Sequence, residues 1–373
     1  MSRWRLPTPR IPRSLAPTTP SANRVLRLET VAVVVAVAIS VWVATSSRVA
    51  ATIVAFMMVW VLMGQSWNIV SGLAGPLALG QAAFFGLTDL LSLQLHAGLK
   101  LNTYVAILLG LLASALLAAL IAVATLRLPA FFFAIASLMV PLILEAVVEY
   151  LGYYQVLRPT YETSHPGQFW WSGPLPYAFI GGGLVIAVTG LTGFIMRRRI
   201  GRYFVAIREN QRAAEATGIA TTRYKLYAFV IAAVVAGMAG ALYAQLTFVF
   251  DPTDAFDPSI SVQALVIALV GGAGTVLGPL VGGLIVVPAD QLAHIYLHQA
   301  PGLDQIGYAL LLLIVALWFP SGAYPSIADG VRSWRARRRI RLEPSLTAEA
   351  DRSRIPEEPL VVGGAVARAE EPR

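Results

Sequence analysis

The sequence predicts an all-α protein, a bundle of helices that cross a membrane many times. Of the 373 residues, 57% are hydrophobic and 13% are charged, and the mean hydropathy is +0.68. Soluble domains typically carry about 25% charged residues. Long apolar stretches recur along the chain, and the charges gather between and outside them. These observations together place the chain among polytopic membrane proteins.

The apolar stretches predict about ten spans, because a helix needs roughly 20 apolar residues to cross the bilayer core. The first follows a long arginine-rich segment, so we expect an uncleaved transmembrane helix and not a cleaved signal peptide. The eighth is short. In chain order they cover residues 29–46, 51–70, 77–95, 103–126, 130–150, 177–196, 226–248, 259–271, 276–297 and 303–319.

The composition changes at both ends of the chain. Residues 1–23 are rich in Pro, Ser, Thr and Arg, which is typical of a disordered basic segment. Residues 331–373 begin with a basic cluster and continue with Pro, Glu and Arg, which predicts a disordered tail. We therefore expect one transmembrane domain over residues 24–330.

The basic residues fall on one side of the predicted topology. The predicted outer segments, 151–176 and 249–258, hold a single Arg between them. By the positive-inside rule, both termini are predicted to be cytoplasmic. The net charge of +8 therefore reflects topology, and no basic stretch is interleaved with aromatic residues as in nucleic-acid binders. The cytoplasmic side holds Arg3, Arg5, Arg10, Arg13, Arg24, Arg27, Arg127, the 197–225 loop and the Arg332–Arg341 cluster.

Two places interrupt the helical pattern. One is Ser71-Gly72-Leu73-Ala74-Gly75-Pro76, and the other is Gly271-Gly272-Ala273-Gly274 with Gly278-Pro279 behind it. Broken backbone at membrane depth survives only where protein or water satisfies its polar groups. Paired interruptions in separated halves point to a transporter's substrate site. Tight turns or close helix packing through small residues explain them equally well.

Polar residues flank the first interruption. Gln65 and Asn68 are three positions apart, on one helix face, and Gln81 opens the third span with Phe84 and Phe85 behind it. Amide groups and aromatic side chains could line the passage of a small solute. Hydrogen bonding between helices is the alternative for each polar residue.

Asp89 lies near the middle of the third span, where an unpaired charge is expensive. We expect it to be neutral, paired or exposed to a water-filled cavity. Glu145 and Glu149 are one turn apart near the outer end of the fifth span, where solvation explains them better than acid–base chemistry. His294 and His298 share a helix face, but no third ligand accompanies them, so no metal site is predicted.

The chain offers no catalytic pattern. It has no cysteine, which excludes disulfides and thiolate sites. It also lacks the G-x-x-x-x-G-K-[ST] phosphate loop, so any ATP must be hydrolysed elsewhere. No cofactor is expected in this chain.

The 197–225 loop is the longest charged insert between spans, RRRIGRYFVAIRENQRAAEATGIATTRYK. Gly218 permits a reversal of the chain between short helical pieces. Arg208, Glu209 and Arg212 supply charges that can pair across an interface. The alternative is a solvated loop placed by the positive-inside bias alone.

Several segments of the chain resemble the branched-chain amino acid ABC-transporter permease family, specifically its LivM-type subunit. The resemblance is carried by Arg208-Glu209-Asn210 and Thr222–Leu226 in the loop, and by the blocks Asn68–Gly86 and Ser259–Pro279. It covers roughly residues 50–320.

The resemblance implies a loop of two short helices, joined near Gly218, that docks into a groove of an ATPase. It also implies a second related permease, two cytoplasmic ATPases that bind ATP and Mg, an external solute-binding protein and an inner-membrane location. The coupling residues would be Arg208, Glu209, Asn210, Arg212, Ala213, Ala214 and Gly218.

The solute remains open at this stage. The chain departs from the family pattern at Leu128-Pro129-Ala130, Thr160–Thr163 and Thr88-Asp89-Leu90. Urea, short amides or aromatic acids are therefore alternatives to branched-chain amino acids. A secondary transporter with Asp89 as proton carrier is a rival from another class, and an integral membrane enzyme is a weaker one.

Overall fold

The computed structural model describes residues 20–153, 173–297 and 322–326, and the regular secondary structure in these ranges is helical. This agrees with the predicted all-α fold. Nine of the ten predicted spans coincide with helices, and the tenth, 303–319, lies outside the described residues. So do residues 331–373 and most of the predicted N-terminal segment, although its last four residues belong to the first helix.

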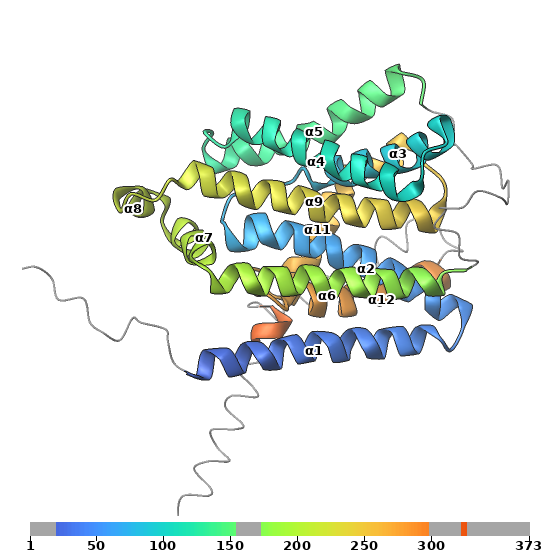
Figure 1. The fold of residues 1–373 in the computed structure, drawn as a ribbon, viewed down its shortest axis with the longest axis horizontal. Coiled ribbons are helices and arrows are strands. Elements are labelled where there is room, and N and C mark those ends of the chain that lie inside the picture. Colours follow the sequence, from blue (N-terminus) through green and yellow to red (C-terminus); the bar gives the residue numbers. More distant parts are fainter. Residues whose placement is uncertain (1–19, 154–172, 298–321, 327–373) are drawn as a thin grey trace, which may run out of the picture. The chain divides into compact units, whose positions relative to one another are not determined.

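Figure 1 shows the order of the helices. They are α1 (Pro20–Ala44), α2 (Arg48–Trp67), the π-helix η2 (Asn68–Leu73), α3 (Gln81–Leu99), α4 (Thr103–Thr125), α5 (Ala130–Tyr150), α6 (Leu175–Arg197), α7 (Arg199–Glu209), α8 (Gln211–Ala216), α9 (Thr221–Thr247), α10 (Pro252–Ala255), α11 (Pro258–Gly271) and α12 (Gly278–Leu297).

Six helical segments of the described chain are long and apolar enough to cross a membrane. The apolar part of α1, Val31–Ala44, is shorter. The outward side of α4 carries large apolar residues that are exposed in the chain alone, including Leu112, Leu116 and Leu120. Such a face suits lipid, because lipid tails are as apolar as leucine.

The helices α2 and α9 form the centre of the packing. α9 packs against α2, α3 and α4, and α2 also packs against α6, α11 and α12. α9 and α3 approach each other closely, because a Cβ at Gly240 would overlap the carbonyl oxygen of Phe85. A glycine at this crossing therefore lets the two backbones touch, as small residues do in membrane bundles.

Both predicted interruptions are present. The α-helical pattern of α2 ends at Trp67 and continues as the π-turn η2, after which the chain is non-helical until α3. π-turns inside helices occur frequently at functional sites. The second interruption separates α11 from α12, which pack against each other.

The predicted 197–225 loop is mostly helical. It forms α7 and α8, and its last residues are the first turn of α9. These helices lie at the end of the bundle where α6 ends and α9 begins (Figure 1).

Candidate functional site at the two helix interruptions

The two interruptions are joined by hydrogen bonds. The side chain of Asn68, the first residue of η2, accepts a bond of 2.7 Å from the backbone N–H of Gly274 through Oδ1. Its Nδ2 donates to the carbonyl oxygen of Thr275 at 2.8 Å. One fully buried amide therefore ties η2 to the 272–277 turn.

Gln65 strengthens the same junction from one turn earlier. Its Nε2 donates to the carbonyl oxygen of Val276 and to Oγ1 of Thr189, each at 3.1 Å. Gln65 is fully buried, and its Oε1 has no hydrogen-bond partner among the described residues. Thr189 brings α6 into the network. Its position gave no signal in the sequence beyond a hydroxyl group within an apolar span.

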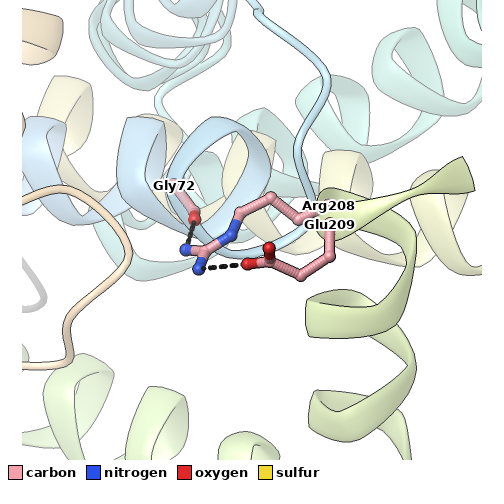
Figure 2. Close-up of polar contacts among 3 residues, drawn as sticks. All are labelled: Gly72, Arg208 and Glu209. Atoms are coloured by element: carbon pink, nitrogen blue, oxygen red, sulfur yellow. Dashed lines mark hydrogen bonds and ion pairs between the residues drawn. The ribbon is translucent and has the colours of Figure 1, made fainter.

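Arg208, near the end of α7, reaches the first interruption. Its Nη1 donates to the carbonyl oxygen of Gly72 at 2.8 Å, and its Nη2 donates to Oε1 of Glu209 at 3.1 Å, as Figure 2 shows. A carbonyl released where a helix ends needs a donor. A guanidinium group supplies a charge-assisted bond, which is stronger than a neutral one.

Glycines make room for this side chain. A Cβ at Gly75 would lie 3.0 Å from Cα of Arg208, and a Cβ at Gly274 would meet the guanidinium group itself. Both glycines have positive φ, +99° and +79°, which favours glycine independently of space. The glycines at the predicted interruptions therefore have two roles. They permit the turns, and they leave space for the side chain of Arg208.

The structure corrects one detail of the predicted loop. The two short helices meet at Asn210, in extended backbone, and Gly218 instead lies between α8 and α9 with φ +86°. Asn210 caps α8, because its Oδ1 accepts from the backbone N–H of Ala213 at 3.1 Å. An Asn cap needs no glycine at the junction.

α7 is anchored by one apolar face. Phe204 and Ile207 are buried, and Phe204 packs in a cluster with Leu73 and Ala74 of the first interruption. In α8, by contrast, Ala214 is buried while Arg212 and Ala213 are exposed. α7 is therefore held against the interruption, and α8 presents an open surface.

Hydrogen bonds favour the ionised form of Glu215 in α8. Nε2 of Gln211 donates to Oε1 of Glu215 at 2.8 Å, and Oγ1 of Thr221 donates to the same oxygen at 2.7 Å. These two bonds, followed by the charges of Lys225 and Arg212, lower the pKa of Glu215 from its ordinary value. The carboxylate form is favoured because both donors stabilise it.

A cleft of about 800 Å³ opens beside α7 and α8. It lies between these helices, the 74–76 segment and the 126–129 turn that joins α4 to α5. Its charged lining residues are Arg127, Arg208, Glu209, Arg212, Glu215 and Lys225.

The remaining predicted pathway residues make no side-chain hydrogen bond to Asn68 or Gln65. Gly271 packs where a Cβ would overlap the carbonyl of Gly278, and Gly272, with φ +117°, accepts at its carbonyl from Oγ1 of Thr275 at 2.7 Å. Gln81 opens α3 fully buried, and both atoms of its amide lack a partner among the residues described. Gln81 makes no bond to the Asn68 network.

The aromatic pair of α3 belongs to the core. Phe84 lies edge-on to Phe229 at 5.5 Å between ring centroids, and Phe85 lies 5.3 Å from the ring of Tyr243. Asp89 is 1% exposed, and within the described chain neither carboxylate oxygen has a hydrogen-bond partner. Asp89 therefore forms no ion pair with any described residue.

Glu145 and Glu149 are half-buried on α5. In the ranges that the structure describes, no three His, Asp or Glu side chains come together as a metal site would require. The side chains of His294 and His298 lie outside the described residues.

Long apolar helices, two of them interrupted inside one polar network, define a multi-pass helical membrane protein. Sequence comparison then gives the family. The chain belongs to the family described as branched-chain amino acid transport system / permease component, whose sequence model matches residues 49–316. This confirms the resemblance seen in the sequence.

Individual relatives match a shorter stretch. The chain is 36% identical over 137 residues to LivH, a high-affinity branched-chain amino acid transport system permease protein of Salmonella typhimurium; the match covers 37% of this chain and 43% of LivH. It is 29% identical over 147 residues to LivM of the same organism, covering 38% and 32%. It is 32% identical over 149 residues to LsrC, an autoinducer 2 import system permease protein of Klebsiella pneumoniae, covering 38% and 43%.

The matched stretch thus spans less than half the length of each of these relatives. No solved structure matches the chain.

Proposed function

We propose that this chain is the membrane-spanning permease subunit of an ATP-driven importer, and that it translocates branched-chain amino acids or a similar small polar solute. Membership of the permease family supports transport and not catalysis. The proposal that ATP drives transport rests on the hydrogen bond from Arg208 to Gly72. This bond joins an exposed loop to an interrupted helix in the membrane.

The proposed protein is a multi-pass protein of the inner membrane, with α7, α8 and both termini in the cytoplasm. The distribution of basic residues supports this orientation. The cleft beside α7 and α8 then opens to the cytoplasm, and the 151–176 and 249–258 segments face outward.

The partners would be a second related permease, two cytoplasmic ATPases that bind ATP and Mg, and an external solute-binding protein. The exposed face of α8, which includes Arg212 and Ala213, is the surface offered to an ATPase. Phe204 and Ile207 anchor α7 against the first interruption, so a pull on α8 that is passed on to α7 would reach η2.

Movement of the ATPases would reach the membrane through two links. Arg208 connects α7 to η2, and Asn68 connects η2 to the turn between α11 and α12. Displacing α7 therefore changes both interruptions together. The binding protein and the nucleotide would each stabilise one arrangement more than the other, which is what shifts such an equilibrium.

The solute is proposed from the relatives. LivH and LivM are described as branched-chain amino acid permeases, whereas LsrC belongs to an autoinducer 2 import system. The match to LsrC favours a second candidate, an importer of another small solute such as urea, a short amide or an aromatic acid.

The test is co-purification of the tagged chain in mild detergent, with bound proteins identified by mass spectrometry. We expect an ATPase pair that is lost when Gly218→Trp places a bulky ring between α8 and α9. Glu149→Gln, on α5, is the matched control and should retain the pair. A chain that purifies alone and still drives uptake into liposomes from an ion gradient would overturn the proposal.

A further inference from the structure

The cleft beside α7 and α8 gathers positive charge from four separate segments of the chain. Its described lining includes four basic and two acidic side chains. Arg127 comes from the turn between α4 and α5, and the other basic residues are Arg208 of α7, Arg212 of α8 and Lys225 of α9. Charges of one sign around a cleft focus the field and attract ions of the opposite sign. The cleft therefore favours an anionic ligand.

The two acidic side chains of the cleft are already engaged. Oε1 of Glu209 accepts a hydrogen bond of 3.1 Å from Nη2 of Arg208. Oε1 of Glu215 accepts from the amide of Gln211 and the hydroxyl of Thr221. These carboxylates therefore neutralise only part of the charge that lines the cleft.

The other basic side chains have no acid as a bonded partner. Arg127 and Arg212 are exposed and make no hydrogen bond or ion pair within the described chain. Nζ of Lys225 donates to Oε1 of Gln211, which is a neutral group. Hydrogen bonds from such cations to phosphate are charge-assisted and are among the strong ones. The cleft thus offers donors of the kind that bind a phosphate group.

One border of the cleft is apolar. Leu128 lines the cleft and is 43% exposed, and the nearby Phe131 and Phe132 are 71% and 57% exposed. The two phenylalanines belong to the start of α5, and Leu128 lies between two helices that are long and apolar enough to cross a membrane. This border therefore lies where acyl chains meet the headgroups. Basic pockets beside transmembrane helices on the cytoplasmic side bind anionic lipid headgroups.

We infer that this cleft binds an anionic phospholipid, with its phosphate at Arg127, Arg212 and Lys225 and its acyl chains along Leu128. A soluble phosphate has the same anionic chemistry but gains nothing from an apolar border, so the occupant is a lipid. Only the cytoplasmic orientation of α7 and α8 is taken from the proposed function. The bound lipid would link the turn between α4 and α5 to α7 and α8, and would thereby restrain the movement of these two helices.

The experiment measures lipid binding to the full chain, purified in neutral detergent, by native mass spectrometry. Phosphatidylglycerol and phosphatidylcholine are titrated onto the wild type, Arg127→Gln and Arg199→Gln. Arg199 is an exposed arginine of α7 that does not line the cleft, so it is the matched control. A neutral detergent has no anionic surface, so a general attraction of the basic chain to a charged membrane does not contribute.

We expect the wild type to bind phosphatidylglycerol more tightly than phosphatidylcholine. Arg127→Gln should weaken the binding of phosphatidylglycerol about fivefold, the usual contribution of one basic residue beside anionic lipid. Arg199→Gln should change it less than about twofold. Arg127 has no described partner to lose, so the thermal unfolding midpoint of Arg127→Gln without added lipid should match that of the wild type.

A second variant separates a lipid from a soluble anion. Leu128→Asn keeps the charge of the cleft and removes an apolar contact, so it should also weaken the binding of phosphatidylglycerol. Glycerol phosphate, which carries the headgroup chemistry without acyl chains, should not displace the bound lipid. Displacement by glycerol phosphate at the concentration at which phosphatidylglycerol itself competes would overturn the lipid as occupant.

Two further results would contradict the site. Equal affinity of Arg127→Gln and wild type for phosphatidylglycerol would show that the cleft does not hold the headgroup. An equal loss in Arg127→Gln and Arg199→Gln would assign the binding to the overall positive charge of this side of the protein. Both results are independent of ATPases and of the transported solute, so they leave the proposed function untouched.

Discussion

The guanidinium group of Arg208 donates a 2.8 Å hydrogen bond to the carbonyl oxygen of Gly72 (Figure 2). This bond joins α7 to η2, which leads into the first predicted interruption. The side chain of Arg208 is 36% exposed, so the contact forms at the edge of the bundle and not in its core. A bond at an edge can be made and broken as α7 moves, which a bond in the packed core cannot do without wider rearrangement.

Removal of this bond is the first prediction. In Arg208→Ala the ATPases should still bind, because α8 is unchanged, but uptake should fall about 10-fold or more while ATP hydrolysis continues. Hydrogen bonds to charged groups contribute about 1.5–3 kcal/mol, which corresponds to that range. The measurement is uptake and hydrolysis in the same proteoliposomes. Arg202→Ala changes an exposed arginine of the same helix and is the control; an equal loss in both variants would contradict a specific role for Arg208.

The second prediction concerns the buried amide of Asn68. Asn68→Ala leaves the N–H of Gly274 and the carbonyl of Thr275 without this partner. Each buried group left unsatisfied costs about 1–3 kcal/mol. We expect the thermal unfolding midpoint to fall clearly. The midpoint is measured by the tryptophan fluorescence of the protein in nanodiscs. Ser46→Ala removes only an exposed local bond to Val43 and should leave the midpoint nearly unchanged. Equal midpoints for the two variants would show that the junction contributes little.

The third prediction compares two glycines that share a backbone conformation. Gly274 has φ +79° and Gly218 has φ +86°, so a change to Ala costs each about 1–2 kcal/mol of strain. A Cβ at Gly274 would also meet the guanidinium of Arg208, whereas a Cβ at Gly218 has nothing within 4 Å. Gly274→Ala should therefore lower uptake far more than Gly218→Ala at matched expression. Similar uptake in the two variants would mean that the space around Arg208 is unimportant.

The sequence predicted the helices well because apolar length is a strong signal. Nine predicted spans recur as helices, with α9 differing from its predicted bounds only near the ends. The two glycine interruptions were also found at the correct positions, since glycine and proline mark breaks wherever they gather. Both features depend on residues that are neighbours in the chain.

The site was predicted only in pieces. Gln65, Asn68, Gly72, Gly274 and Arg208 were each singled out, but their meeting in one network depends on packing between distant segments, which periodicity does not report. Thr189 was missed because one hydroxyl in an apolar helix is unremarkable in sequence. The joint of α7 and α8 was placed near Gly218 because glycine is the usual signal of reversal, whereas the amide of Asn210 performs that task.

The last prediction concerns acid sensitivity of α8. Bonds from Gln211 and Thr221 lower the pKa of Glu215 in the folded chain, so this carboxylate stabilises α8 above its unfolded pKa of about 4.3. The stabilisation is lost as the pH falls through the lower, folded pKa. We expect hydrogen-exchange protection of residues 211–221 to decline below about pH 4.3, relative to α9 in the same sample. Glu215→Gln should abolish this decline, and Glu209→Gln should retain it, because Glu209 makes neither bond. A decline that is the same in all three proteins would assign the acid sensitivity to other groups.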